Sequence, residues 1–166
     1  MIMNILIPYF KHQLQEEAVT TRKMLALVPA DKLDWLPHPK SMSLVRLATH
    51  VAEIPSWVPM ITDWEELDFS KGNYAPPVIN GSGDLLAYFE KNFKSGTAAL
   101  EKVSDDILDR PWSMRNGDQI FFTLPKSEVL RLTLSQIIHH RAQLGVYLRL
   151  LDIPIPGSYG PSADEQ

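Results

Sequence analysis

The strongest helical pattern in the chain runs from Lys126 to Leu151 and reads KSEVLRLTLSQIIHHRAQLGVYLRLL. At about 100° of rotation per residue, five of its apolar side chains fall within about 80° of one another on one side of a helix. Pro154 and Pro156 stop the pattern, because proline cannot continue a helix. The segment therefore predicts a long amphipathic helix, with an inward stripe made by Leu130, Ile137, Leu144, Leu148 and Leu151.

Two polar residues share this stripe. His140 lies inside it, and Gln136, one turn earlier, lies only about 40° away on the same face. His139 falls about 100° from His140, at the flank of the stripe. Arg141 and Arg149 are predicted to point away on the other side. A polar pair four residues apart is thus expected to face the interior of the protein.

Three earlier segments have the same periodicity. Their predicted ranges are from about Pro8 to Val28, from an N-cap at Ser41 or Ser43 through Val58, and from Ser82 or Asp84 to about Val103. We expect Pro55 and Pro59 to kink the second helix or end it early. The inward residues of the first two helices are predicted to be Phe10, Leu14, Leu25, Val28, Leu44, Leu47, Val51, Ile54 and Val58.

The connections are rich in turn-forming residues. Residues 65–83 are predicted to form a long loop, and 111–122 an irregular stretch or a short extended pair with its turn at Asn116-Gly117. The tail after Pro156 is expected to be extended. Together these predictions give an all-α protein, a four-helix bundle with long crossover connections, as one domain over residues 1–166.

Composition excludes several classes of function. The net charge is −4 and the basic residues are scattered, so we expect no nucleic-acid partner. The chain has no cysteine, which excludes disulfides and a cysteine nucleophile. No apolar run approaches a membrane span, and the apolar residues 1–7 lack the basic start of a signal sequence. A cytoplasmic protein with no membrane partner is expected.

A second histidine can reach the same interior. His50 lies at the edge of the apolar stripe of the second helix, so it is predicted to look into the bundle. A histidine from one helix facing Gln136 and His140 from another is how bundle cores assemble a divalent cation. The alternative is that these histidines are hydrogen-bonded core residues without a metal.

Glu17 is a carboxylate on the apolar stripe of the first helix, where it must be paired, protonated or linked to a metal. It and His139 are candidates to support the ligands of a metal site. An internal salt bridge from Glu17 to Arg22, Arg46 or Arg141 is an equal alternative. His12 and His38 are expected to be surface and loop residues with no functional role.

Three stretches resemble the DinB-like family of damage-inducible four-helix bundles, which are related to bacterial thiol S-transferases. They are PHPKSMSL running into LATHVAE (residues 37–53), QIIHHRAQL (136–144) and the tail YGPSADE (159–165). The resemblance spans most of the chain. It implies a divalent metal, zinc or nickel, held by His50, Gln136 and His140. Relatives usually carry histidine where this chain has Gln136, and an amide oxygen is a weaker ligand than imidazole.

The resemblance also implies a function: a metal-dependent transferase that conjugates an external low-molecular-weight thiol, such as bacillithiol or mycothiol, to a small-molecule electrophile. A homodimer is expected as well. Two alternatives stay open. One is a metal-dependent hydrolase in which Glu17 or Glu53 assists an activated water. The other is a non-catalytic bundle, for ligand binding or the stress response, in which Gln136 marks a weakened metal site.

Overall fold

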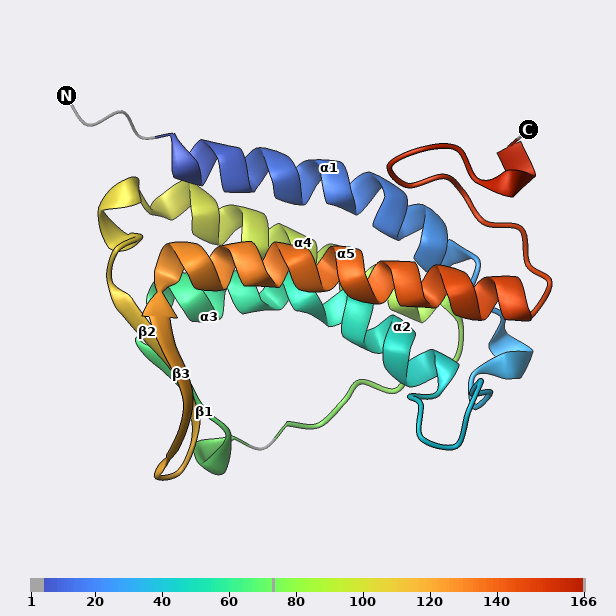
Figure 1. The fold of residues 1–166 in the computed structure, drawn as a ribbon, viewed down its shortest axis with the longest axis horizontal. Helices are drawn as coiled ribbons and strands as arrows, with labels where there is room; N and C mark the ends of the chain where they lie inside the picture. Colours follow the sequence, from blue (N-terminus) through green and yellow to red (C-terminus); the bar gives the residue numbers. More distant parts are fainter. Residues whose placement is uncertain (1–4, 73, 166) are drawn as a thin grey trace.

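Helices α1 (Leu6–Ala26), α2 (Leu44–Glu53), α3 (Trp57–Asp63), α4 (Ser82–Lys102) and α5 (Lys126–Leu150) run along the long axis of the computed structural model. The structure describes residues 5–72 and 74–165, so most of the apolar run 1–7 lies outside the described residues. A single 3-10 turn joins α2 to α3, and the two together form one bent rod. Figure 1 shows this rod, α1, α4 and α5 lying lengthwise beside one another. The predicted bundle of four helical rods is confirmed.

The helix boundaries agree closely with the sequence pattern. Ser43 caps α2, because its side chain accepts a hydrogen bond from the backbone N–H of Arg46. Helix α1 starts at Leu6, two residues before Pro8, where Asp105 accepts hydrogen bonds from the first backbone N–H groups of the helix. That carboxylate arrives from a distant part of the chain, so local sequence could not predict this start.

The bend between α2 and α3 falls at Pro55, as predicted. Proline has no N–H to continue the helix, and the backbone passes through the turn Ile54–Ser56. Helix α4 approaches this bend closely at Gly96, where a Cβ atom would meet the Pro55 carbonyl oxygen at 2.6 Å. Nearby on α4, the buried Asn92 donates a hydrogen bond of 3.0 Å to the carbonyl of Ala52, near the end of α2. These contacts fix the C-terminal end of α2.

A small sheet stands at one end of the bundle, so the all-α prediction was wrong in this respect. Strand β2 (Pro111–Asn116) pairs antiparallel with β3 (Gln119–Pro125), and Gly117 takes the positive φ of 57° that their turn requires. This hairpin is the extended pair expected from Asn116-Gly117. Strand β1 (Glu66–Asp68) lies within the predicted loop and pairs parallel with β2. Its three residues are too few for a local strand pattern, and only the contact with β2 makes them a strand.

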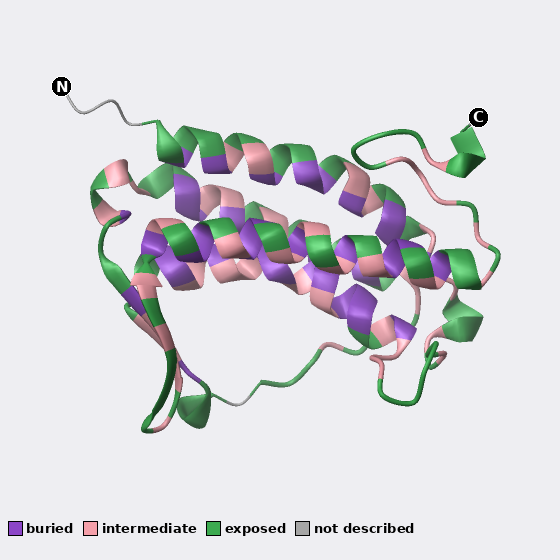
Figure 2. Ribbon diagram, viewed as in Figure 1, coloured by how far each residue is buried: buried purple, intermediate pink, exposed green. Residues whose placement is uncertain are grey.

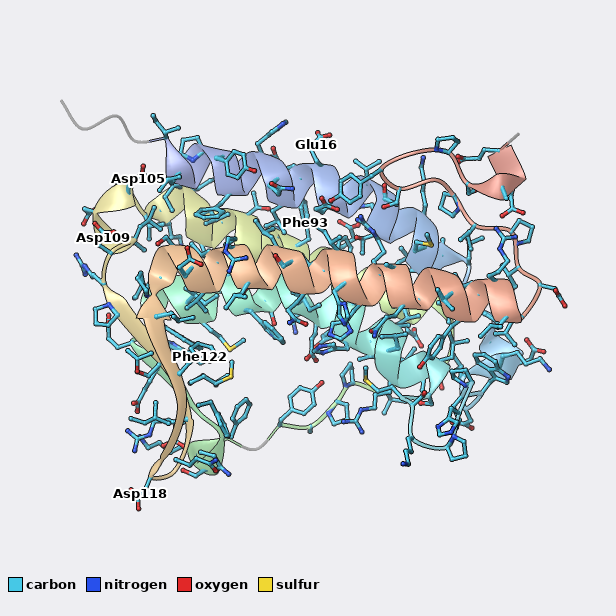
Figure 3. The ribbon with its side chains drawn as sticks, viewed as in Figure 1. Glu16, Phe93, Asp105, Asp109, Asp118 and Phe122 are labelled. Carbon is cyan, nitrogen blue, oxygen red and sulfur yellow. The ribbon has the colours of Figure 1, made fainter. Side chains whose placement is uncertain are left out.

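The core follows the inward faces of the helices (Figure 2). Two clusters of buried apolar residues fill it, and Phe93 packs against both. Figure 3 shows Phe93 between the helices, Phe122 on the inner side of the sheet, and Asp118 at the tip of the hairpin. All the apolar residues predicted to face inward from the first two helices are buried: Phe10, Leu14, Leu25, Val28, Leu44, Leu47, Val51, Ile54 and Val58.

The tail folds back over α1 and α5 instead of staying extended throughout (Figure 1). It ends in a 3-10 turn, Ala163–Glu165. Asp164 binds the guanidinium of Arg149 and accepts a hydrogen bond from the backbone N–H of Ile155. Glu165 in turn accepts hydrogen bonds from the backbone N–H groups of Gly157 and Ser162. The expectation of an extended tail was therefore wrong for its last residues, because side chains of the tail satisfy its own backbone.

Candidate functional site

His50 and His140 meet at the middle of the bundle, where α2 faces α5. Their ring centroids are 4.6 Å apart and the rings are inclined at 72°. His50 stands in the last turn of α2, just before the bend, and His140 stands in the middle of α5. Both side chains are partly buried. The structure therefore brings together the two histidines that the sequence singled out.

Each imidazole is held through its Nδ1 atom by the residue three positions further along its own helix. His50 Nδ1 lies 3.1 Å from Glu53 Oε1, and His140 Nδ1 lies 2.7 Å from Gln143 Oε1. A carboxylate or carbonyl oxygen accepts, so each Nδ1 carries the proton and each Nε2 keeps its lone pair. No hydrogen bond engages either Nε2 within residues 5–72 and 74–165. This tautomer is the one that a metal-ligating histidine needs.

Electrostatics favour the neutral form of His140. Burial lowers the pKa of this histidine below its ordinary value; the hydrogen bond that its ring donates to Gln143 opposes the shift, and His50 and His139 reinforce it. At neutral pH the ring is therefore uncharged, with a lone pair available to a ligand. His139 is exposed, 4.8 Å from His140 between ring centroids. Its flanking position agrees with the helical angles, and its ring lies against that of His140.

Two aromatic residues from other elements complete this region. The bend at Pro55 places Trp57, in the first turn of α3, 5.6 Å from His50 between ring centroids. Tyr74, from the connection between β1 and α4, donates a hydrogen bond from its hydroxyl to Glu53 Oε2. We call the set His50, Glu53, Tyr74 and His140 the histidine cluster.

The donor set fits a divalent cation that accepts nitrogen ligands. Two imidazoles supply them, each oriented by an outer hydrogen bond. Gln136 lies one turn before His140, is half-buried, and makes no side-chain hydrogen bond within the described residues. Its role as a ligand through the amide oxygen stays a prediction. Among those residues no group of three or more His, Cys, Asp or Glu side chains is arranged to hold a metal, so a third strong ligand is missing.

Glu17 lies in a different cluster. Its Oε2 atom is 2.7 Å from Arg141 Nη2, and its Oε1 atom accepts a hydrogen bond from the Tyr159 hydroxyl of the tail. Arg141 also donates to the Glu17 carbonyl and to Thr21 on α1, and to Ser158 in the tail. The salt-bridge alternative for Glu17 is the one observed. We call Glu17, Arg141 and Tyr159 the arginine cluster.

The prediction that Arg141 points away from the core was wrong. Arg141 is one of the most buried charged residues, with a side chain 3% exposed. Helix α5 contacts α2 on one side and α1 on another, so residues well outside its apolar stripe are also covered. Arg149 is exposed, as predicted.

The sequence identified the two histidines but not the residues that hold and surround them. Gln143 and Glu53 each follow a histidine by three residues, a spacing that puts two side chains on one helical face. That signal was present and could have found both. Trp57 and Tyr74 had no such signal, because their positions depend on the bend and on the course of a long connection.

The comparisons with known proteins agree with this fold. The DinB family model matches residues 3–166. The chain belongs to the DinB family. No curated protein matches it. Among solved structures, a DinB-like protein from Bacillus cereus is 22% identical, with a TM-score of 0.68, covering 90% of this chain and 95% of that one.

Two more solved structures are similar. A putative member of the DinB family from Exiguobacterium sibiricum has 19% identity and a TM-score of 0.70, covering 94% of this chain and 98% of its own. A DinB-like protein from Bacillus subtilis has 16% identity and a TM-score of 0.68, covering 95% and 98%. At these identities the likeness establishes the fold. Separately, none of the helices in the described residues has the length and apolar character to cross a membrane.

Proposed function

We propose that this DinB-family protein is a divalent-metal-dependent transferase that conjugates an external low-molecular-weight thiol to a small electrophile. The observation that carries the proposal is the pair of imidazoles, His50 and His140, each with Nδ1 hydrogen-bonded and Nε2 unengaged. Such a pair is prepared to bind a metal of the zinc or nickel type. The resemblance of the chain to the DinB-like family, which is related to bacterial thiol S-transferases, supports the choice of reaction.

A bound divalent cation would supply a Lewis acid that lowers the pKa of the attacking thiol. The residues of the chain itself bind and orient. Glu53 and Gln143 hold the two rings in the ligating tautomer, and the ring of Trp57 lies beside that of His50. In the net reaction the thiol loses its proton, a carbon–sulfur bond forms, and the leaving group departs from the electrophile with its electron pair. Because the chain has no cysteine, the thiol must come from outside.

The two carboxylates named for a hydrolase are both engaged. Arg141 and Tyr159 take the two oxygens of Glu17, and His50 and Tyr74 take those of Glu53. A general base needs an oxygen that can accept a proton from water. The geometry therefore favours the transferase over the hydrolase. Cytoplasmic location, a homodimer and a stress-response role stay predictions.

The test is a conjugation assay on purified protein whose metal content has been measured. Bacillithiol and other small thiols are offered with a chromogenic aryl halide, before and after metal removal by a chelator. We expect activity that chelation abolishes and zinc or nickel restores. His140→Ala should reduce it at least tenfold by removing an imidazole ligand, while His12→Ala, at an exposed position of α1, should not. Equal rates in wild type and His140→Ala would contradict the proposal, and hydrolysis without thiol would favour the hydrolase.

A further inference from the structure

The connection between β1 and α4 touches the histidine cluster through one side chain. Residues 71–72 and 75–76 are exposed, and Tyr74 itself is 69% exposed, yet its hydroxyl reaches the largely buried carboxylate of Glu53. Burial of that hydroxyl and its hydrogen bond with Glu53 raise the pKa of Tyr74, so it stays a hydrogen-bond donor over the physiological range. The chain thus carries a hydrogen-bonded series from a surface connection to a candidate ligand.

Glu53 stands in the middle of this series. One oxygen, Oε1, receives the Nδ1 proton of His50 at 3.1 Å, and the other, Oε2, receives the Tyr74 proton. A glutamate side chain has several rotatable bonds, and a single hydrogen bond leaves it freedom to turn. The second hydrogen bond fixes the plane of the carboxylate. With that plane fixed, Oε1 stays where it holds the His50 ring.

We propose that Tyr74 is a positioning residue for the metal site, which acts on His50 through Glu53 and thereby couples the β1–α4 connection to metal binding. The proposal rests on the proposed function in that it takes His50 as a ligand. Outer hydrogen bonds of this kind orient ligands and tune affinity, and their loss typically weakens metal binding by about 10- to 100-fold. Tyr74 is separated from His50 by two hydrogen bonds and Glu53 by one, so the loss of Tyr74 should weaken metal binding less than the loss of Glu53.

The central variant is Tyr74→Phe, which removes the hydroxyl and keeps the ring. Zinc affinity, measured by competition with a chromophoric chelator, should fall about three- to tenfold, whereas Glu53→Gln should lower it by about 10-fold or more. The double variant should bind zinc no worse than Glu53→Gln alone, because Tyr74 acts only through Glu53. Tyr9→Phe is the matched control, because Tyr9 is an exposed α1 residue whose hydroxyl makes no hydrogen bond within the described residues. Loss of that hydroxyl should leave the zinc affinity unchanged.

A second readout does not depend on metal. In metal-free protein, NMR of the imidazole nitrogens should show His50 with its proton on Nδ1. Tyr74→Phe should shift His50 toward a mixture of tautomers and leave His140, held by Gln143, unchanged. The thermal unfolding midpoint should change little, because Tyr74 as a residue is 69% exposed and its ring, which the variant keeps, is not part of the core.

The outcomes separate the two proposals. Unchanged His50 nitrogen shifts in Tyr74→Phe, or additive losses of zinc affinity in the double variant, would overturn the role of Tyr74. If the wild-type protein binds no divalent metal, the proposed function fails, and the metal-free nitrogen shifts still decide whether Tyr74 positions His50.

Discussion

The histidine cluster and the arginine cluster are built on consecutive residues of α5, and they follow the same plan. Each joins α5 to another helix that carries a glutamate. In each, one oxygen of that glutamate is bound by a histidine or arginine and the other by a tyrosine, from a connection in one case and from the tail in the other. In the arginine cluster, however, a guanidinium balances the carboxylate, and both side chains are at most 5% exposed. In the histidine cluster, two imidazole rings keep unengaged Nε2 atoms within the described residues, and the His50 side chain is 25% exposed.

This difference separates a structural role from the binding role proposed for the histidines. A buried guanidinium and carboxylate that satisfy each other hold helices and tail together and offer nothing to a ligand. Neutral imidazoles with fixed tautomers and partial exposure leave lone pairs unused, which is what a metal site requires. The type of residue on α5, and not the surrounding plan, decides which role each cluster takes.

The largest effect is expected when the arginine cluster is broken. Arg141→Leu leaves the buried carboxylate of Glu17 without its cation, so the free energy of unfolding should fall by about 3–5 kcal/mol in urea denaturation. Arg131→Ala is the control, because Arg131 forms an exposed pair with Glu128, and it should cost less than about 1 kcal/mol. Similar losses in both variants would contradict a special role for the buried pair.

The next largest effect is an expected gain in the zinc affinity of the histidine cluster. Gln136→His adds a third imidazole one turn from His140, so zinc affinity should rise about tenfold or more, since imidazole is the stronger ligand. Unfolding in urea should be little changed. Ser135→His places the same ring on the exposed neighbouring position of α5 and should give no gain. If Gln136→His also gives none, Gln136 does not face the histidine pair.

Smaller effects on stability and on zinc affinity are expected when the hydroxyls of the two tyrosines are removed. Tyr159→Phe removes one hydrogen bond to the carboxylate of Glu17, and we expect about 1 kcal/mol less stability with unchanged zinc affinity. Tyr74→Phe should show the opposite pattern, with weaker zinc binding and unchanged stability. Measuring unfolding and zinc competition on both variants checks this, and the same pattern in both would remove the distinction between the clusters.

The smallest expected effect is the loss of folding stability in acid that results from protonating Asp164 in the tail. Arg149 and the backbone N–H of Ile155 hold the pKa of Asp164 below its ordinary value. A carboxyl with a lowered folded pKa contributes stability that is present above its unfolded value and is lost as pH falls through the folded one. Wild type should therefore lose more stability than Asp164→Asn in urea unfolding between about pH 5 and pH 3.

Asp118→Asn serves as its control, since Asp118 stands at the exposed tip of the hairpin (Figure 3). This variant should lose stability with acid as wild type does. An Asp164→Asn protein with the acid response of wild type would show that the tail contact contributes nothing measurable.

Local sequence determined much of this protein. The period of apolar residues located the helices, Ser43 and Pro55 marked a start and a bend, and helical angles selected His50 and His140 as inward residues. These features succeed because a helix repeats every 3.6 residues, so that local spacing fixes which side chains share a face. The same rule misplaced Arg141, because α5 is covered on more than one side and its apolar stripe marks only part of its buried surface.

Only the tertiary structure decided which side chains and strands pair with one another. Local spacing could not choose between Arg22, Arg46 and Arg141 for Glu17, since the observed partner is 124 residues away. Nor could it find Tyr74 beside Glu53, or the pairing of β1 with β2, because a connecting segment carries no period that tells where it crosses the bundle. Local spacing thus identified the inward apolar stripes and the two histidines, because residues that share a helical face recur with the helical period. The packing of helices, loop and tail decided that Glu17 is paired with Arg141, while His50 and His140 keep ring nitrogens without a hydrogen-bond partner among the described residues.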